Sequence, residues 1–274
     1  MGGSLFVVAT PIGHLDDMTV RAVETLRVCD AILCEDTRHS RVLLERYGID
    51  KPLIAHHKFN EQKSLEGILE RLRGGQRLAL ISDAGTPCIN DPGWVLVRGC
   101  VEAGIAVTGL PGACSPINAL VLSGFDAGRF QFVGFLPKKG LGAVLRGVLG
   151  FAGTTVALES PGRLIGTLEE IMALDAERPV AVAREMTKAF EECRRGSVRE
   201  VLASFQKSGV RGEICLVIAG GRLPEEDLPV GELVELLQQC HGMTLKEAVK
   251  LSAKLKGVAK NEVYREFFHP AEEE

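Results

Sequence analysis

Short apolar runs alternate with helical patterns along the first half of the chain. Each run is rich in Val, Ile and Leu, and each is followed by a segment whose apolar residues recur every three or four positions. The pairs are FVVA with Met18 to Val28, AILCE with Ser40 to Tyr47, PLIAH with Lys63 to Leu72, LALIS with Trp94 to Val101, and IAVTGL with Ile117 to Leu122. Alternation of this kind predicts βαβ units and therefore a mostly parallel sheet.

Three helix starts are expected from their cap chemistry. Asp91-Pro92, Ser115-Pro116 and Ser160-Pro161 each combine a side-chain acceptor with a following proline. The acceptor is typical of the N-cap position and the proline of the first helical residue. We therefore expect a strand-end loop to turn into a helix at each of these dipeptides.

A change of pattern near Phe130 predicts a second domain. Its expected strands are QFVGFLP, TVALES, PVAVARE and EICLVIAG, separated by amphipathic stretches at Leu164 to Met172 and Val198 to Phe205. This is again an α/β arrangement, for which we expect a mixed sheet. The predicted domains are an N-terminal α/β domain at 1–125, a second α/β domain at 126–222 and a helical C-terminal module at 230–274, with linker composition at 220–229.

The C-terminal module carries a lysine stripe. Thr244 and Glu247 have capping-box spacing, and Lys246, Lys250 and Lys254 recur every four residues, which places them on one helix face. A solvated surface stripe and a nucleic-acid contact are both compatible with this pattern. The closing Glu272 to Glu274 is expected to be a frayed acidic tail.

Composition places the chain among ordinary globular proteins. It has 274 residues, of which 46% are hydrophobic and 25% charged. No apolar run approaches the roughly 18 to 20 residues that a membrane span requires, and the run Leu5 to Thr10 is broken at once by Pro11. We therefore expect a cytoplasmic protein with no membrane partner.

Cysteines and histidines give no metal-site pattern. The eight cysteines contain no C-x-x-C pair and mostly lie in apolar runs, as expected for reduced thiols packed as small hydrophobes. The adjacent His56 and His57 do not share a face of a regular element, so we expect no metal. A net charge of −4 and a pI near 5.9 argue against a wholly basic nucleic-acid surface, so any RNA contact must be local.

The stretch Ser82 to Gly93, SDAGTPCINDPG, is the strongest candidate for a ligand loop. It follows the strand-like run Leu78 to Ile81 and precedes a helix. In an open α/β sheet the ligand crevice lies outside the carboxyl ends of the strands, and a loop rich in Gly, Pro and Asp there is suited to backbone contacts. The first strand leads into Thr10-Pro11-Ile12-Gly13 rather than a dinucleotide or phosphate-loop motif, which disfavours NAD and nucleoside triphosphates.

Charged residues also follow several predicted strands. They are Glu35-Asp36-Thr37-Arg38 after the second strand, Asp83 after the fourth, Glu159 after TVAL, and Arg184-Glu185 with Lys188 after PVAVA. Any one carboxylate can equally be a helix cap or an ion-pair partner, and the acid pair before Thr37 can simply cap the next helix. Their convergence on one crevice would favour a catalytic or binding role.

Seven motifs, in this order, closely resemble one family. TPIGHL, EDTR, HKFNE, SDAGTPCINDPG, LPGACS, GFLP and AREMTK are similar to the bacterial small-subunit ribosomal RNA methyltransferases that modify a cytidine ribose 2′-hydroxyl, within the tetrapyrrole methylase superfamily. The resemblance implies an α/β, two-domain tetrapyrrole-methylase-like fold, S-adenosylmethionine as cofactor between the domains, and a homodimer. It implies small-subunit ribosomal RNA as partner, within an assembled ribosomal particle.

The resemblance also implies site residues. The cofactor is expected to touch Pro11, Asp83, Ala84, Gly85, Cys88, Cys114, Ser115 and Leu158. A weakly nucleophilic hydroxyl benefits from a carboxylate that accepts its proton, and our hypothesis assigns this role to Glu35, with Asp36 as second candidate. Arg38 and Lys188 are expected to hold substrate phosphate.

The sequence is compatible with other functions. The lysine stripe on the predicted C-terminal helix is our candidate RNA contact. A methyltransferase of the same fold could instead act on a small tetrapyrrole or a modified protein side chain. A nucleotide-sensing or scaffold protein without catalysis is compatible with the bare βα pattern.

Overall fold

The computed structural model describes residues 2–221, 228–241 and 243–268, apart from the side chains of Cys240 and His241. The tail Glu272 to Glu274 and most of the expected linker 220–229 lie outside the described residues. The chain divides into two compact units, the first made of Met1–Gly124, Val182–Arg194 and Arg211–Leu216, and the second of Phe125–Ala181, Arg195–Val210 and Val217–Glu274.

The first unit is built on a five-stranded parallel sheet, as the alternation of strands and helices predicts. The strands are β1 (Ser4–Val8), β2 (Ala31–Cys34), β3 (Leu53–Ala55), β4 (Arg77–Leu80) and β5 (Ala106–Leu110), in the order β3-β2-β4-β1-β5. Every pairing between neighbours is parallel.

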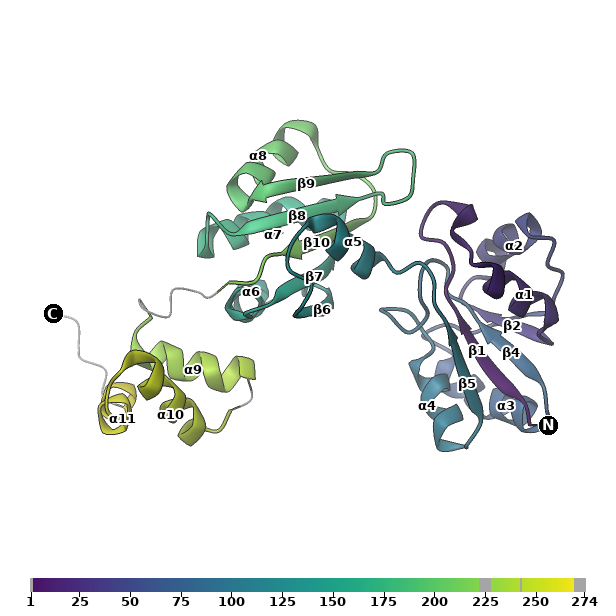
Figure 1. Cartoon of the computed structure of the whole chain (residues 1–274), viewed down its shortest axis with the longest axis horizontal. Helices are drawn as coiled ribbons and strands as arrows, with labels where there is room; N and C mark the ends of the chain where they lie inside the picture. The colour runs from purple at the N-terminus through teal and green to yellow at the C-terminus, as the bar shows by residue number, and fades with distance from the viewer. Residues whose placement is uncertain (1, 222–227, 242, 269–274) are drawn as a thin grey trace. The chain divides into compact units, whose positions relative to one another are not determined.

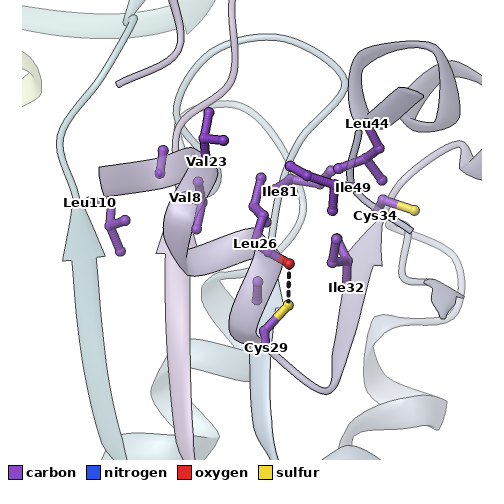
Figure 2. Close-up of a cluster of buried hydrophobic side chains, with 12 residues drawn as sticks. Val8, Val23, Leu26, Cys29, Ile32, Cys34, Leu44, Ile49, Ile81 and Leu110 are labelled. Atoms are coloured by element: carbon purple, nitrogen blue, oxygen red, sulfur yellow. Dashed lines mark hydrogen bonds between the residues drawn. The ribbon is translucent and has the colours of Figure 1, made fainter. Parts of the chain in front are cut away.

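Helices cover both faces of this sheet. They are α1 (Val20–Val28), α2 (Thr37–Arg46), α3 (Glu61–Arg73) and α4 (Trp94–Glu102). A further helix, α5 (Ser115–Ser123), follows β5. Side chains of α1 and α2 pack in one buried cluster, where Figure 2 shows Leu26 near Val8 and Ile81, and Leu44 near Ile49. Side chains of α3 and α4 form a second cluster with other strand residues. Two separate cores follow from a strand order that reverses, because right-handed crossovers in opposite directions place their helices on opposite faces.

The loop after β4 lies where that order reverses. Strand β4 stands between β2 and β1, whose loops lead to α2 and α1, whereas its own loop leads to α4. Neighbouring loops that diverge to opposite faces leave a crevice at the carboxyl edge of the sheet. The tertiary fold therefore supports this edge as the place of a ligand site.

The second sheet is mixed, as expected. Its strands are β6 (Phe130–Phe135), β7 (Thr154–Glu159), β8 (Pro179–Arg184), β9 (Glu192–Ser197) and β10 (Ile214–Ile218), in the order β6-β7-β10-β8-β9. β6 and β7 are parallel. The Ala219 N–H donates to the Pro179 carbonyl, which joins the end of β10 to the start of β8. The Glu185 N–H donates to the Glu213 carbonyl, which joins the end of β8 to the start of β10, so the two strands are antiparallel. The associated helices are α6 (Leu141–Gly150), α7 (Pro161–Leu174) and α8 (Val198–Ser208).

The chain ends in three helices, as predicted. α9 (Val230–His241), α10 (Leu245–Lys256) and α11 (Lys260–Phe268) lie together in Figure 1 and share a small apolar core that includes Leu233, Val249 and Val263. The capping box at the start of α10 is present, with Thr244 and Glu247 bonding each other's backbone N–H. The three lysines of the stripe are exposed.

The cap predictions are wrong at two helices and partly right at a third. α4 begins after Gly93 rather than at Asp91-Pro92, and α5 has Cys114 at its N-cap, which makes Ser115 its first residue. Ser160 does precede Pro161 at the start of α7, but its side chain makes no capping hydrogen bond. Proline restricts only its own φ and the residue before it, so tertiary contacts of the loops decide where each helix starts.

Strand β9 was not predicted. Its sequence, ECRRGS, lacks the apolar alternation of a buried strand, and it stands at the edge of the second sheet. An edge strand is half solvated and tolerates charged side chains.

The seven described cysteines are free thiols, and no described helix is long and apolar enough to cross a membrane.

Candidate active site at the carboxyl edge of the first sheet

The loop Ser82 to Gly93 is fastened to the end of β1. Thr10 and Gly85 exchange two backbone hydrogen bonds, at 2.9 and 3.0 Å. The Thr10 hydroxyl donates to the Ser82 carbonyl at 3.0 Å, and Thr86 Oγ1 donates to the Ala113 carbonyl at 2.9 Å. These bonds tie the loops after β1, β4 and β5 into one structure.

The same loop has an uncommon backbone conformation. Cys88 and Asn90 have φ values of 72° and 66°, in the left-handed region that non-glycine residues rarely adopt. Gly93 has φ of 129°, and a Cβ there would stand 2.6 Å from Leu80 Cδ2, so this position requires glycine. Strained residues persist where the surrounding structure holds them, and they concentrate at functional sites.

A buried carboxylate clamps the far end of the loop. Glu61, in the first turn of α3, accepts a hydrogen bond from the Gly93 backbone N–H at 2.6 Å. Its Oε1 also lies 3.8 Å from Nε2 of His56, which is fully buried. Burial lowers the pKa of His56, and the adjacent charge of Glu61 opposes this effect. The sequence reasoning missed Glu61 as a site residue, although it ends the HKFNE motif.

Three carboxylates at the carboxyl edge of the sheet, those of Glu35, Asp83 and Asp91, are close enough for their charges to act on one another. Burial raises the pKa of Glu35, and the neighbouring Asp83 raises it further, while His57 opposes this shift. Burial likewise raises the pKa of Asp91 to about 6, with Glu35 and Asp83 adding to the shift and Ser82 opposing it. No hydrogen bond to the Glu35 carboxylate is found within the described residues. The structure thus brings Glu35 and Asp83 together and adds Asp91, for which the sequence indicated only a cap.

Asp36 is committed to local structure. Its side chain caps α2 by accepting from Arg38 N at 2.8 Å, and it also pairs with the Arg38 guanidinium at 2.8 Å. The side-chain and backbone hydrogen bonds from Arg38 hold the pKa of Asp36 far below its usual range. Its own N–H donates to Asp83 Oδ1 at 3.2 Å, so it joins the loops after β2 and β4. The capping alternative holds for Asp36.

A second segment, Arg184 to Glu191, packs against the loop after β1. Gly13 is needed there because a Cβ would stand 2.6 Å from both Lys188 Cγ and Thr187 Oγ1. The His14 N–H donates to Thr187 Oγ1 at 3.0 Å. Glu185 and Thr187 both have positive φ, at 51° and 64°. Backbone strain thus recurs in a second loop of the same unit.

Lys188 lies between two carboxylates. Its Nζ is 2.8 Å from Glu213 Oε2 and 3.1 Å from Glu185 Oε1. Burial lowers the pKa of Lys188, but the hydrogen bonds to these two carboxylates outweigh that effect and raise it overall. A hydrogen bond from the Glu213 backbone N–H, together with Lys188, lowers the pKa of Glu185. Lys188 is therefore a charged and positioned ammonium group.

A hollow of about 430 Å³ opens between the loops after β1 and β5. Its lining includes Ile12, Gly112, Ala113, Cys114 and Thr187. The rest of the lining comes from Asp17 and from Ile117, Asn118 and Val121 of α5, so apolar and polar side chains share the wall, as is usual for a small-molecule site.

Most of the expected cofactor residues lie around this edge. Pro11, Cys114 and Ser115 adjoin the hollow, and Asp83, Ala84, Gly85 and Cys88 belong to the β4 loop. Leu158 lies on β7, in the second unit. Glu159 follows it and is fully occupied, since it accepts from Ser160 N and Thr167 Oγ1 and pairs with Arg163. The described residues contain no group of three or more His, Cys, Asp or Glu that could hold a metal ion.

Comparison with known proteins settles the family. Residues 4–202 match the model of the Tetrapyrrole (Corrin/Porphyrin) Methylases. The chain belongs to the tetrapyrrole methylase family. It is 44% identical to "Ribosomal RNA small subunit methyltransferase I" of Escherichia coli O157:H7, over 96% of this chain and 94% of that protein. The predicted family and fold class are confirmed.

Two further relatives carry the same name. The protein of Bacillus subtilis (strain 168) is 40% identical, over 96% of this chain and 93% of its own length. The protein of Thermotoga maritima is 43% identical and is covered over 99% of its length by 80% of this chain. About a fifth of this chain therefore has no counterpart in that relative.

Solved structures of low identity share the fold of this family. Uroporphyrin-III C-methyltransferase from Thermus thermophilus, complexed with S-adenyl homocysteine, has a TM-score of 0.55 at 19% identity and covers 79% of this chain and 97% of its own. Diphthine synthase has a TM-score of 0.61 at 14% identity, over 94% of this chain and 100% of its own. Likeness at this level concerns the fold alone.

Proposed function

We propose that this protein transfers a methyl group from S-adenosylmethionine to the 2′-hydroxyl of a cytidine ribose in small-subunit ribosomal RNA. One observation carries the proposal: identity of 44% over nearly the whole chain to a protein named for methylation of small-subunit ribosomal RNA. The cytidine and its 2′-hydroxyl come from the resemblance of the seven motifs.

The residues at the carboxyl edge fit the cofactor. S-adenosylmethionine supplies an electrophilic methyl group on a cationic sulfur. Gly85 has φ of 86°, and a Cβ there would stand 3.3 Å from Ile12 Cγ2. A Cβ on Gly112 would stand 2.8 Å from Ala9 Cβ. Glycine at these positions lets the loops after β1, β4 and β5 approach one another closely. We assign the cofactor to Pro11, the loop residues Asp83 to Gly85 and Cys88, the turn at Cys114 and Ser115, and Leu158.

Glu35 is our candidate for the group that accepts the proton of the ribose hydroxyl. Its carboxylate combines a raised pKa with the lack of a hydrogen-bonding partner within the described residues. A stronger base in hydrogen-bond reach of the hydroxyl can contribute about 10²- to 10⁴-fold to the rate. Asp36 fits this role less well, because Arg38 and the α2 backbone occupy it.

Phosphate contacts are assigned to cations near the site and on the C-terminal helices. The side chain of Arg38 is 89% exposed and can exchange Asp36 for a phosphate. Lys188 must exchange its ion pairs with Glu185 and Glu213 to bind a phosphate. The exposed lysines of α10 are our candidates for more distant RNA contacts, namely Lys246, Lys250 and Lys254. We further propose that the enzyme acts in the cytoplasm as a homodimer and that its substrate is an assembled ribosomal particle.

The test is transfer of a labelled methyl group. Purified protein is incubated with methyl-labelled S-adenosylmethionine and either unmethylated small ribosomal subunits or naked small-subunit RNA. Nuclease digestion then identifies the labelled nucleoside. We expect label on the ribose of a single cytidine, with subunits preferred over naked RNA. Label on a base, or none on either RNA, would refute the proposal.

Small tetrapyrroles and modified protein side chains stay alternative substrates of the same fold. The family model is named for tetrapyrrole methylases, and the solved structures that act on such substrates are 14 to 22% identical, which concerns the fold alone. A parallel assay with a precorrin-like acceptor compares them directly with the ribosomal RNA.

A further inference from the structure

The turn between β3 and α3 presents a phenylalanine ring to solvent. Phe59 is 94% exposed. The backbone that carries it is held firmly, since the His57 N–H donates to Asn60 Oδ1 at 2.8 Å and Asn60 Nδ2 donates to the Ala55 carbonyl at 2.9 Å. The backbone N–H groups of Asn60 and Glu61 both donate to the His57 carbonyl. The backbone that carries the exposed ring is therefore held in place by a hydrogen-bonded turn.

This turn adjoins the acidic crevice. The rings of His57 and Phe59 meet edge to face, with centroids 6.2 Å apart. Cys34 pairs with Ala55, and the His56 N–H donates to the Cys34 carbonyl at 2.8 Å, so Glu35 and His57 directly follow two joined strand ends. Glu61, two residues after Phe59, binds the end of the β4 loop at Gly93. The aromatic pair thus stands beside the candidate proton acceptor.

A cation completes the turn. Lys58, between the two rings in sequence, is exposed and forms no ion pair with any described residue. The crevice itself carries the carboxylates of Glu35, Asp83 and Asp91, which repel a phosphate. A positive charge at the rim offsets this repulsion for an anionic strand.

These features match the chemistry of an unpaired nucleotide. Proteins recognise single-stranded RNA by stacking its bases on aromatic rings and by placing cations near its phosphates. Isolated exposed apolar residues are common and need no function. Phe59 differs from them because its backbone lies in a hydrogen-bonded turn, its ring contacts an imidazole, an exposed ammonium group precedes it, and the turn lies at the edge of the site.

We propose that His57, Lys58 and Phe59 bind one unpaired nucleotide of the RNA strand that carries the acceptor ribose. The base stacks on the Phe59 ring, and its phosphate lies at the Lys58 ammonium group. This inference rests on the proposed function and adds to it the residues that hold the substrate strand beside Glu35.

The test compares three variants of Phe59 in the full chain. Phe59→Trp keeps an aromatic face, Phe59→Leu keeps apolar bulk without one, and Phe59→Ala removes both. Methylation of unmethylated small ribosomal subunits gives KM and kcat, and calorimetry with S-adenosylhomocysteine gives cofactor affinity. The control is Val28→Ala. Val28 is the last residue of α1, is 53% exposed, and lies at the end of the helix that is farther from the loop after β1.

Loss of one stacked base is expected to raise KM by about 5- to 150-fold in both Phe59→Ala and Phe59→Leu. Phe59→Trp and Val28→Ala should stay within about twofold of the parent, and cofactor affinity should be unchanged in all four. Lys58→Gln should reduce the slope of log affinity against log salt by about 0.7, the value for one contact to a single strand.

Several outcomes would overturn this inference. Unchanged KM in Phe59→Ala removes the stacking contact. Parent-like KM in Phe59→Leu shows an apolar contact rather than stacking. A change of oligomeric state in Phe59→Ala, measured by sedimentation, assigns the ring to contact with a second copy. In each case the parent still methylates the RNA. If the parent itself transfers no methyl group, the proposed function fails first.

Discussion

Glu61 is predicted to hold the ligand loop in place, and its replacement by alanine should destabilise the first unit. The substitution removes the acceptor of the 2.6 Å bond from the buried Gly93 N–H. Hydrogen bonds to charged groups contribute about 1.5 to 3 kcal/mol, and a buried donor left without a partner costs a similar amount. We expect a loss of about 2 kcal/mol in the free energy of unfolding, which lowers Tm by about 4 to 8 °C for a domain of this size.

Glu61→Gln separates the hydrogen bond from the charge. Its amide oxygen can still accept from Gly93, so we expect about half the loss seen in Glu61→Ala. The control is Glu66→Ala on the same helix, whose carboxylate pairs with Arg73 in an ion pair with both side chains about half or more exposed. Exposed ion pairs contribute at most about 1 kcal/mol, so this control should stay close to the parent.

A single tryptophan reports on the end of the loop. The chain has one tryptophan, Trp94, which directly follows Gly93 and begins α4. Urea unfolding followed by circular dichroism gives the global stability, and tryptophan emission reports the end of the loop. Glu61→Ala within about 0.5 kcal/mol of the parent would refute the clamp. Equal losses in Glu61→Gln and Glu61→Ala would show that the charge, not the hydrogen bond, matters.

Three further predictions concern catalysis, pH and RNA. Glu35→Gln should lower kcat by about 10²- to 10⁴-fold with cofactor affinity unchanged; activity within about twofold of the parent would remove Glu35 from the mechanism. The pKa of Asp91, about 6 in the folded state against 3.8 as its ordinary value, means that the folded protein binds the extra proton, so stability falls as pH rises from about 4 to above 6. Asp91→Asn should therefore stabilise the protein by about 1 kcal/mol at pH 7.5, after allowance for solvent screening, and not at pH 4; equal urea midpoints of variant and parent at pH 7.5 would contradict this. Glutamine at all three lysines of the α10 stripe, Lys246, Lys250 and Lys254, should lower the salt dependence of RNA binding and leave cofactor binding intact; an unchanged salt slope would count against an RNA contact there.

Local sequence determined the regular elements of the first unit. Runs such as Ala31–Cys34 and Arg77–Leu80 are short and apolar, and the helices between them have one apolar face, so strand and helix follow from periodicity alone. Parallel pairing follows as well, because a helix between successive strands makes a crossover connection. The glycines, prolines and aspartates of the β4 loop likewise marked it as irregular backbone after a buried strand.

The tertiary structure decided which side chains act together. Asp91 and Ser115 have the local chemistry of caps, yet α4 begins at Trp94 and α5 at Ser115, and Asp91 lies close enough to Glu35 for that carboxylate to raise its pKa. Strand β9 forms because an edge of the second sheet is free to pair with it, which its polar sequence does not indicate. Glu61 meets Gly93 across 32 positions of the chain, a contact that no local pattern encodes. Periodicity reports which face of an element is buried, whereas the neighbours of a loop residue depend on strand order and on how separate loops pack.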